Sequence, residues 1–269
     1  MDKAPLVTIL KNHAVHLQID ATYFKQFCLV CYQDFGLKYT QLHRFTDNEN
    51  FEEIREDLEN LKTLGLNILS ITCDGHPAIL TAIKSVFKKR PIQRCLVHIQ
   101  RMCLIWLTSQ PKSEAGLELR EIVLLINKIK VYNDKIEFKK LLRQWHLKHK
   151  DYIDQKSLNQ ETQRYWYTHK MVRRAFITIN RALPNMFHFI ENPSIPKTTN
   201  SIESYFGHLK NYLDLHRGLT KKNRINFIKW YIHFNNKKRF LSQISMPINY
   251  IKRGLKKPSN LLYIHQLYC

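Results

Sequence analysis

Residues 15–24 read V-H-L-Q-I-D-A-T-Y-F, a segment that alternates apolar and polar side chains and carries an acid near its end. In an extended chain successive side chains point to opposite faces. Val15, Leu17 and Ile19 would then share one face, and Asp20 would lie on the other. A single aspartate here is usually a turn or capping residue. Two later acids stand in comparable positions, which makes Asp20 a candidate catalytic residue around which the fold is organised.

The residues that follow have the pattern of further strands and a helix. Strands are predicted at residues 27–32 and 37–45, joined by a hairpin turn at residues 33–36. The next segment begins with several glutamates, which favour the start of a helix, and either Asn48 or Asn50 can cap it.

A second acid stands at the end of the next strand. A short apolar run ends at Asp74, and the turn-forming residues Gly75 and Pro77 follow it. A helix is then predicted at residues 78–87 and a strand at residues 92–97. The carboxyl end of such a parallel strand faces a ligand in many α/β proteins. The order of elements predicts an α/β fold with a mixed five-stranded sheet and flanking helices.

The remainder of the chain is predicted to be mainly helical. Helical periodicity dominates residues 98–183, and a Pro-rich loop occupies residues 193–200. A helix starts at the end of that loop with Asn200 or Ser201 as its cap, which places Glu203 in the first turn. Glu203 is the third candidate acid.

Basic and aromatic residues are interleaved in two places. Residues 164–174 hold Tyr165, Trp166 and Tyr167 among arginines and lysines, and residues 215–222 form a basic turn before an aromatic helix at residues 225–234. Such surfaces can follow phosphates and stack on bases. Aromatic core ridges with solvated basic flanks are the alternative explanation.

Charge narrows the class of partner. The chain carries 43 Lys and Arg against 22 Asp and Glu, a formal charge of +21, and its 44% hydrophobic content is enough for a large core. A polyanionic partner follows, with nucleic acid favoured over an acidic membrane. A ribosome-associated or generically basic protein is the alternative. Apolar runs are too short to span a bilayer and the first residues do not resemble a secretion signal, so a cytoplasmic protein is expected.

The cysteines do not indicate a disulfide framework. Six cysteines in a chain of this length are compatible with reduced thiols. Cys28 and Cys31 have the C-x-x-C spacing, but within a strand this offset places them on opposite faces, which argues against shared zinc or redox chemistry.

Three acids at two strand ends and one helix start can converge on divalent cations. Mg²⁺ prefers oxygen ligands and keeps sites for substrate phosphates. Asp20, Asp74 and Glu203 are therefore predicted to hold Mg²⁺ or Mn²⁺ for in-line phosphodiester chemistry, in which the ions activate the attacking hydroxyl and stabilise the leaving oxygen.

Four motifs in this order resemble the Mutator-type transposases of bacterial insertion sequences, which are DDE transposases with an RNase H-like fold. The motifs are I-D-A-T-Y-F at residues 19–24, T-C-D-G-H at 72–76, Q-R-C-L-V-H at 93–98, and T-N-S-I-E-S at 199–204 followed by H-R-G-L at 216–219. Each motif alone is weak evidence, but their order and spacing together are specific. Asp20 and Asp74 are 54 residues apart, and Asp74 and Glu203 are 129 residues apart.

The resemblance implies a domain plan, a bacterial nucleoid-associated location and a set of partners. An RNase H-like core would occupy residues 1–110 and 193–236, with an all-helical insertion at 111–192 and a basic tail at 237–269. The partners would be double-stranded DNA, as terminal inverted repeats and target, and further copies of the chain, at least a dimer on DNA. DNA contacts are predicted at Arg94, Arg101, Arg173, Arg174, Lys210, Arg217, Lys221 and Lys222; a solvated basic turn is the alternative for the last three.

The C-x-x-H pair of the third motif, Cys95 and His98, is implied by the resemblance to have a structural or DNA-handling role beside the active site. The spacing supplies only two ligands, half of a structural zinc site, and no second pair is evident, so zinc is not expected there. His76, beside the second acid, could touch a substrate phosphate or serve as a local hydrogen-bonding residue.

The resemblance also has a departure. Members of the family normally carry an amino-terminal DNA-binding region, whereas nineteen residues precede Asp20 here. A truncated or frameshifted copy, or targeting by a separate product, is expected. Three functions thus stay open: an active transposase, a non-catalytic DNA-binding remnant, and a metal-dependent nuclease or Holliday-junction enzyme of the same fold.

Overall fold

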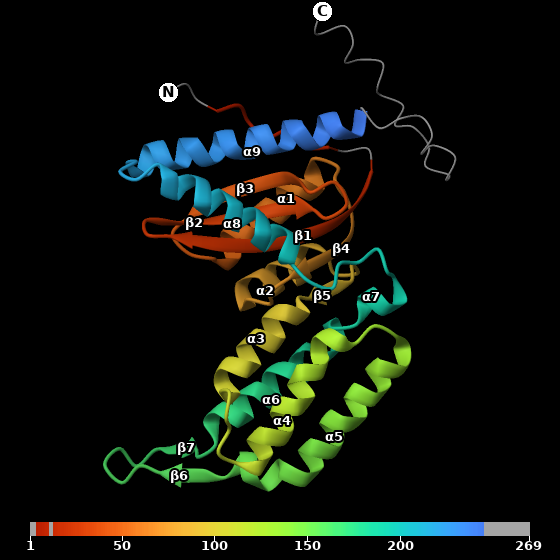
Figure 1. The fold of residues 1–269 in the computed structure, drawn as a ribbon, viewed down its shortest axis with the longest axis vertical. Coiled ribbons are helices and arrows are strands. Elements are labelled where there is room, and N and C mark those ends of the chain that lie inside the picture. The colour runs from red at the N-terminus through yellow and green to blue at the C-terminus, as the bar shows by residue number, and fades with distance from the viewer. Residues whose placement is uncertain (1–3, 11–12, 245–269) are drawn as a thin grey trace, which may run out of the picture.

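The centre of the molecule is a mixed five-stranded sheet (Figure 1). The computed structural model describes residues 4–10 and 13–244. The strands are β1 (Ala14–Phe24), β2 (Phe27–Asp34), β3 (Tyr39–Thr46), β4 (Asn67–Cys73) and β5 (Ile92–Arg94). Their order is β3-β2-β1-β4-β5, with β1, β2 and β3 antiparallel and with β4 and β5 parallel to β1. This is the RNase H-like arrangement, which confirms the predicted fold class.

Helices cover both faces of the sheet, so β2, which lies between β3 and β1, is buried along its whole length. On one face α1 (Phe51–Thr63) and α2 (Pro77–Val86) pack on the side chains that include Val15, Leu17, Ile19 and Cys28. On the other face α8 (Asn200–Leu215) and α9 (Lys221–Ile244) pack on those that include Cys31. Cys28 and Cys31 therefore lie in different cores, as their spacing predicted.

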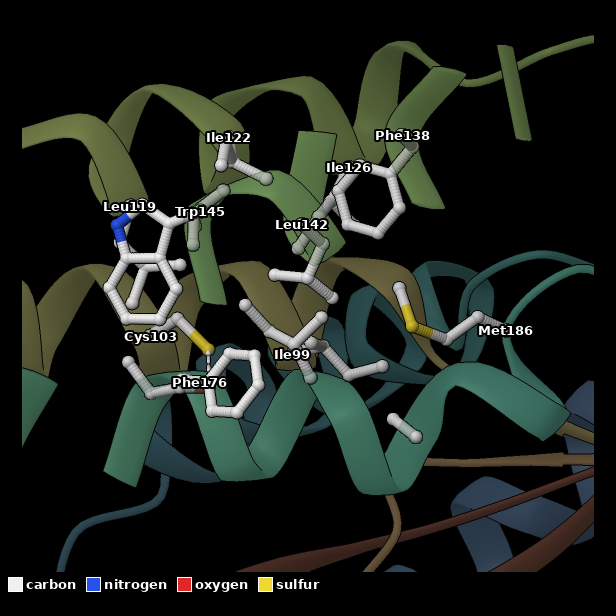
Figure 2. Close-up of a cluster of buried hydrophobic side chains, with 14 of the residues drawn as sticks. Ile99, Cys103, Leu119, Ile122, Ile126, Phe138, Leu142, Trp145, Phe176 and Met186 are labelled. Atoms are coloured by element: carbon white, nitrogen blue, oxygen red, sulfur yellow. Dashed lines mark hydrogen bonds between the residues drawn. The ribbon is translucent and has the colours of Figure 1, made fainter. Parts of the chain in front are cut away.

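A second, mainly helical unit extends from the β5 end of the sheet (Figure 1). It consists of α3 (Leu96–Leu107), α4 (Glu114–Leu125), α5 (Tyr132–Asp154), α6 (Lys170–Ala182) and α7 (His188–Glu191), with 3₁₀ turns at Ile126–Lys128 and Leu183–Asn185. Figure 2 shows its core, where Trp145 and Phe176 pack with Cys103 of α3. The Nε1–H of Trp145 donates to the Ala115 carbonyl at 2.9 Å, so this buried indole is satisfied.

The insertion is not all-helical. A two-stranded hairpin, β6 (Lys156–Leu158) and β7 (Tyr165–Tyr167), projects from it between α5 and α6. Tyr165 and Trp166 are exposed on this hairpin, so the aromatic residues that could have been core ridges on a helix are surface residues. The helical prediction was wrong here because the strands are only three residues long and leave almost no alternation to detect.

Two predicted boundaries also differ, and one open alternative is resolved. The strand predicted at residues 92–97 ends at Arg94, because the chain turns into α3 at Leu96. The basic tail predicted from residue 237 is helical through Ile244, as the last part of α9, and residues 245–269 lie outside the described residues. Asn50, rather than Asn48, caps α1, and its side chain accepts from the Glu53 backbone N–H at 2.9 Å.

Within residues 4–10 and 13–244, no helix is long and apolar enough to cross a membrane.

Candidate active site

The sheet places the first two acids side by side. Strands β1 and β4 run parallel with Ile19 opposite Cys73. Asp20 and Asp74, one residue further along each chain, thus come together where β4 ends. The prediction that Asp20 closes its strand was wrong, because β1 continues to Phe24 in its pairing with β2. Because Ile19 packs against the α1 and α2 side, Asp20 faces the opposite side, as the alternation predicted.

Asp20 is a buried carboxylate with little compensating positive charge. Its exposed fraction is 5%, and its Oδ1 accepts from the Ala21 N–H at 2.9 Å. Burial raises the pKa of Asp20 to about 7; the positive charge of His98 opposes this rise, while the negative charges of Asp74 and Glu203 add to it. An ionised Asp20 would therefore be stabilised by a cation bound beside it.

A tight turn fixes the second acid. The Oδ1 of Asp74 accepts from the His76 N–H at 2.8 Å, and Gly75 adopts the left-handed region with φ of 92°. The guanidinium of Arg94, which is 8% exposed, donates to the Asp74 carbonyl from Nε at 3.3 Å and from Nη2 at 3.1 Å. Arg94 therefore holds the backbone of the turn that carries Asp74.

Replacing Gly75 tests how tightly this turn is built. A Cβ at position 75 would lie 1.9 Å from the Cζ of Arg94 and would add strain at a positive φ. Gly75→Ala is expected to cost about 2–3 kcal/mol of unfolding free energy and to lower the thermal midpoint by several degrees, measured by differential scanning calorimetry. Gly207→Ala is the matched control: Gly207 is exposed inside α8 with nothing within 4 Å of the added Cβ, so this change should be neutral or stabilising. Equal effects of the two changes would contradict the predicted role of the turn.

The third acid follows a loop that is held against the sheet by hydrogen bonds. Glu203 stands in the first turn of α8, 129 residues after Asp74. Buried side chains of two strands and the first residue of α3 bind the carbonyls of the preceding loop. These bonds run from Gln18 Nε2 to Thr198 O (2.7 Å), from Thr72 Oγ1 to Pro196 O (3.0 Å) and from Leu96 N to Lys197 O (3.1 Å).

Thr199 caps α8, so the prediction of Asn200 or Ser201 was wrong by one or two residues. The Thr199 side chain makes no capping bond to the helix, which explains why the capping pattern missed it. Its buried hydroxyl instead lies 3.4 Å from each of three atoms, namely Cys95 Sγ, His98 Nδ1 and Glu203 Oε1.

Cys95 and His98 form a polarised pair beside Glu203. Burial opposes ionisation of the Cys95 thiol, but hydrogen bonds from His98 and from the Thr199 hydroxyl and N–H outweigh it and lower the pKa of Cys95. The bond to Cys95, together with the charges of Asp20 and Glu203, raises the pKa of His98 to about 9 despite desolvation. His98 Nδ1 lies 3.6 Å from Glu203 Oε1, and Arg101 reaches Oε2 from Nη1 and Nη2 at 3.4 Å.

The tightest group of metal-ligand atoms is not the three acids. Among the described residues, the set whose ligand atoms all lie within 4.8 Å of one another consists of Cys95, His98 and Glu203. The three acids lie close enough for the negative charges of Asp74 and Glu203 to raise the pKa of Asp20. They do not, however, form so compact a set of ligand atoms. That they hold a divalent cation together stays a prediction.

Comparison with known proteins decides the family. The model of the family described as "Transposase, Mutator family" matches residues 42–204, more than half of the chain, and this span includes Asp74 and Glu203. The chain belongs to the Mutator family of transposases. A comparison with curated protein sequences finds no match.

Solved structures similar to this Mutator-family protein include retroviral integrases. A dimeric form of the HTLV-2 integrase catalytic core domain in complex with magnesium is 21% identical, and the match covers 45% of this chain and 90% of that chain. A trimeric form is 19% identical, with 61% and 97% covered. A simian T-cell lymphotropic virus intasome in complex with PP2A regulatory subunit B56 gamma is 18% identical, with 49% and 54% covered. Each TM-score is 0.25, so the fold assignment rests on the strand order.

The basic residues predicted to bind DNA lie in different surroundings. Arg101, Lys210, Arg217, Lys221 and Lys222 are exposed on or beside the helices that flank Glu203. Arg173 pairs with Asp154 at 2.6 Å and lies over the Tyr167 ring, and Arg174 lies over Trp106. Arg94 is buried in the Asp74 turn. DNA contact stays a prediction for all of them, and the burial of Arg94 favours a structural role.

The contacts of two residues of the site had no signal in the sequence, although one of them, Thr199, opens the T-N-S-I-E-S motif. Thr199 is 104 residues from Cys95, and only the fold brings them together. Glu49 lies in the loop before α1; burial raises its pKa, and the negative charge of Asp74 adds to the rise, although the bond from the Tyr23 hydroxyl at 2.9 Å opposes it. Only the fold places Glu49 near Asp74, so the sequence could not predict this pair of acids.

Proposed function

We propose that this Mutator-family transposase cleaves DNA at the ends of its element and joins the released 3′-hydroxyls to target DNA, with Asp20, Asp74 and Glu203 as the catalytic acids. The observation that carries the proposal is the convergence of three carboxylates from β1, the end of β4 and the start of α8 at one end of the sheet. No single motif in the chain requires this convergence.

The donor set suits Mg²⁺ or Mn²⁺. Hard divalent cations take carboxylate oxygens, and Asp20 is a buried carboxylate whose pKa is raised above all by burial, with the negative charges of Asp74 and Glu203 adding to the rise. Asp20, Asp74 and Glu203 would hold the ions. When bound, divalent ions supply activation of the attacking water or 3′-hydroxyl and neutralisation of charge on the phosphodiester.

The protein's own residues position these acids. Arg94 and Gly75 fix the Asp74 turn, and the loop fastened by Gln18 and Thr72 fixes the start of α8. Phosphoryl transfer depends mainly on positioning and charge, so a rigid arrangement of this kind favours the in-line reaction. Arg101, paired with Glu203 and exposed, is suited to meet a substrate phosphate.

The partners proposed are the terminal inverted repeats of the element and the target DNA, bound as double strands. A formal charge of +21 supports attraction to phosphates. Joining two element ends needs two active sites close together, so we propose a homo-oligomer, at least a dimer, on DNA.

The test is cleavage and joining on duplexes that carry the inverted repeats flanking the gene. The full chain should nick these duplexes and join their 3′ ends to a plasmid in Mg²⁺, with EDTA as the control. DNA binding without metal-dependent turnover would leave the non-catalytic remnant, and cleavage of branched DNA without joining would leave a nuclease. Either result would contradict the proposal.

Removing charge from the turn between α8 and α9 should weaken binding to any DNA. The triple change Arg217→Gln, Lys221→Gln, Lys222→Gln removes three exposed charges and is expected to reduce affinity about tenfold or more at low salt and to lower the slope of log affinity against log salt by about 2–3. Fluorescence anisotropy over a salt series measures both. Lys148→Gln is the control: Lys148 is exposed but paired with Glu114 and Glu118 in the helical unit. An unchanged slope in the triple variant would remove this turn from the DNA interface.

A further inference from the structure

Cys95, His98 and Glu203 combine three ligand types of a transition metal at one point. Cys95 immediately precedes α3 and His98 lies in its first turn, three residues later, so both side chains lie on the same side of the helix start. Glu203 comes from the first turn of α8. Their ligand atoms lie within 4.8 Å of one another, which no other set among the described residues does.

One pair of ligand atoms, and the distances from the Thr199 hydroxyl to all three, are close to the spacing in a tetrahedral site. Two ligands bound about 2.0–2.1 Å from a tetrahedral zinc ion lie about 3.4 Å from each other. His98 Nδ1 and Glu203 Oε1 are 3.6 Å apart, and the Thr199 hydroxyl is 3.4 Å from Sγ, Nδ1 and Oε1 alike. Zinc could therefore enter with small side-chain movements, taking the Thr199 hydroxyl or a water molecule as its fourth ligand.

The thiol of Cys95 is prepared for this role by its neighbours. The N–H and the hydroxyl of Thr199 both donate to Cys95 Sγ, at 3.3 and 3.4 Å, which favours the thiolate, the form that binds metal. The other described cysteines lie in apolar strands or helices; Cys103, two turns further along α3, is buried in the insertion core and contacts the Ala175 carbonyl. The C-x-x-H pair supplies only two ligands, and the fold brings Glu203 beside them as the third.

We propose that Cys95, His98 and Glu203 bind a thiophilic divalent cation, zinc above all, and that zinc bound there withdraws Glu203 from the magnesium centre and so inhibits the enzyme. A thiolate and an imidazole select zinc over magnesium, whereas three carboxylates select magnesium. Glu203 belongs to both sets, so the two metals compete for its carboxylate. The inhibitory half of the proposal rests on the proposed function, but metal binding at the cluster does not.

Cobalt titration of the full chain tests the binding directly. Co²⁺ replaces zinc in such sites, and a thiolate ligand gives a thiolate-to-cobalt charge-transfer absorption in the near ultraviolet. All variants carry Cys269→Ser, which removes a thiol outside the described residues. The parent should develop the absorption at one equivalent of Co²⁺ and lose it when zinc is added. Cys95→Ser should lack it, and His98→Gln and Glu203→Gln should need at least about tenfold more Co²⁺.

Cys103→Ser is the matched control, because it removes a buried thiol from the same helix and should retain the absorption. Circular dichroism establishes that each variant is folded. His98→Gln and Glu203→Gln keep the thiol, so the proposal stays testable even if Cys95→Ser fails to fold. No absorption in the parent, or an absorption that survives Cys95→Ser or is unaffected by both His98→Gln and Glu203→Gln, would overturn the site.

DNA-cleavage activity tests the inhibitory part of the proposal separately from metal binding. In excess Mg²⁺, zinc at the concentration that displaces Co²⁺ should reduce DNA cleavage at least about tenfold, and a chelator selective for zinc should restore it. Cobalt binding without zinc inhibition would overturn the inhibitory role alone. If the protein cleaves no DNA in Mg²⁺ at all, the proposed function fails, while the cobalt result still decides the metal site.

Discussion

Asp20→Asn, Asp74→Asn and Glu203→Gln are each expected to reduce metal-dependent cleavage and joining by at least about 10³-fold. Each change keeps the size of the side chain but removes the charge that would hold the cation. The three residues act as one centre, so a double change should cost little more than the worst single change. Rates are measured under single-turnover conditions with Mg²⁺ in excess over a range of concentrations.

An exposed acid on the same helix provides the control for this experiment. Asp214→Asn removes a carboxylate from α8, near its end and away from Glu203, and should keep the rate within about twofold. Circular dichroism excludes unfolding as the cause of any loss. A variant of one of the three acids that cleaves at the parent rate would exclude that residue from the catalytic set.

Asp20→Asn is also expected to stabilise the metal-free protein. The pKa of Asp20 is raised to about 7 by burial, so the folded state binds this proton more tightly than the unfolded state, whose group titrates near 3.8. Stability from this group is fully present below pH 4 and is lost as pH rises through 7. The loss at pH 8 is at most roughly 4 kcal/mol, and removing it should raise the thermal midpoint by roughly 5–10 °C.

The divalent cation should reverse this effect in the parent. Mg²⁺ or Mn²⁺ bound beside an ionised Asp20 stabilises the folded state, so the parent midpoint at pH 8 should rise with metal concentration and that of Asp20→Asn should not. Thermal unfolding at pH 5 and pH 8, with and without metal, measures both effects.

Asp57→Asn is the control, because Asp57 is a buried acid whose charge is compensated by its neighbours. Asp57 is equally buried, but it accepts from Arg44 at 2.6 and 2.8 Å and from the Tyr32 hydroxyl at 2.9 Å. Its charge is already compensated, so Asp57→Asn should destabilise the protein by about 2–4 kcal/mol. If Asp20→Asn destabilised the protein in the same way, Asp20 would be a structural acid. That result would contradict the statement that its buried charge is uncompensated in the metal-free protein.

Much of the fold was predictable because the signals are local. Alternation in residues 15–24 fixed the face of Asp20, and Asn50 with the glutamates after it fixed the start of α1. The three-residue offset of Cys28 and Cys31 correctly separated them into two cores. These features depend on neighbours in the chain, which the sequence displays directly.

The parts that sequence could not predict depend on distant contacts or on very short elements. Strands β6 and β7 have three residues each, too few for a pattern. Thr199 caps α8 without a capping bond because its hydroxyl faces Cys95, His98 and Glu203. The third ligand-type atom beside the C-x-x-H pair, a carboxylate oxygen of Glu203, is brought there only by the fold, so the spacing of the pair could not predict it.

The most direct test of the three-acid centre is the anomalous scattering of Mn²⁺ in crystals of the protein. Mn²⁺ prefers carboxylate oxygens and gives an element-specific signal. We expect a Mn²⁺ peak bound by Asp20 of β1 and by Asp74 just after the end of β4, on the side of Glu203, and no such peak in Asp20→Asn. A Mn²⁺ site that touches neither aspartate, or none at saturating Mn²⁺, would contradict it.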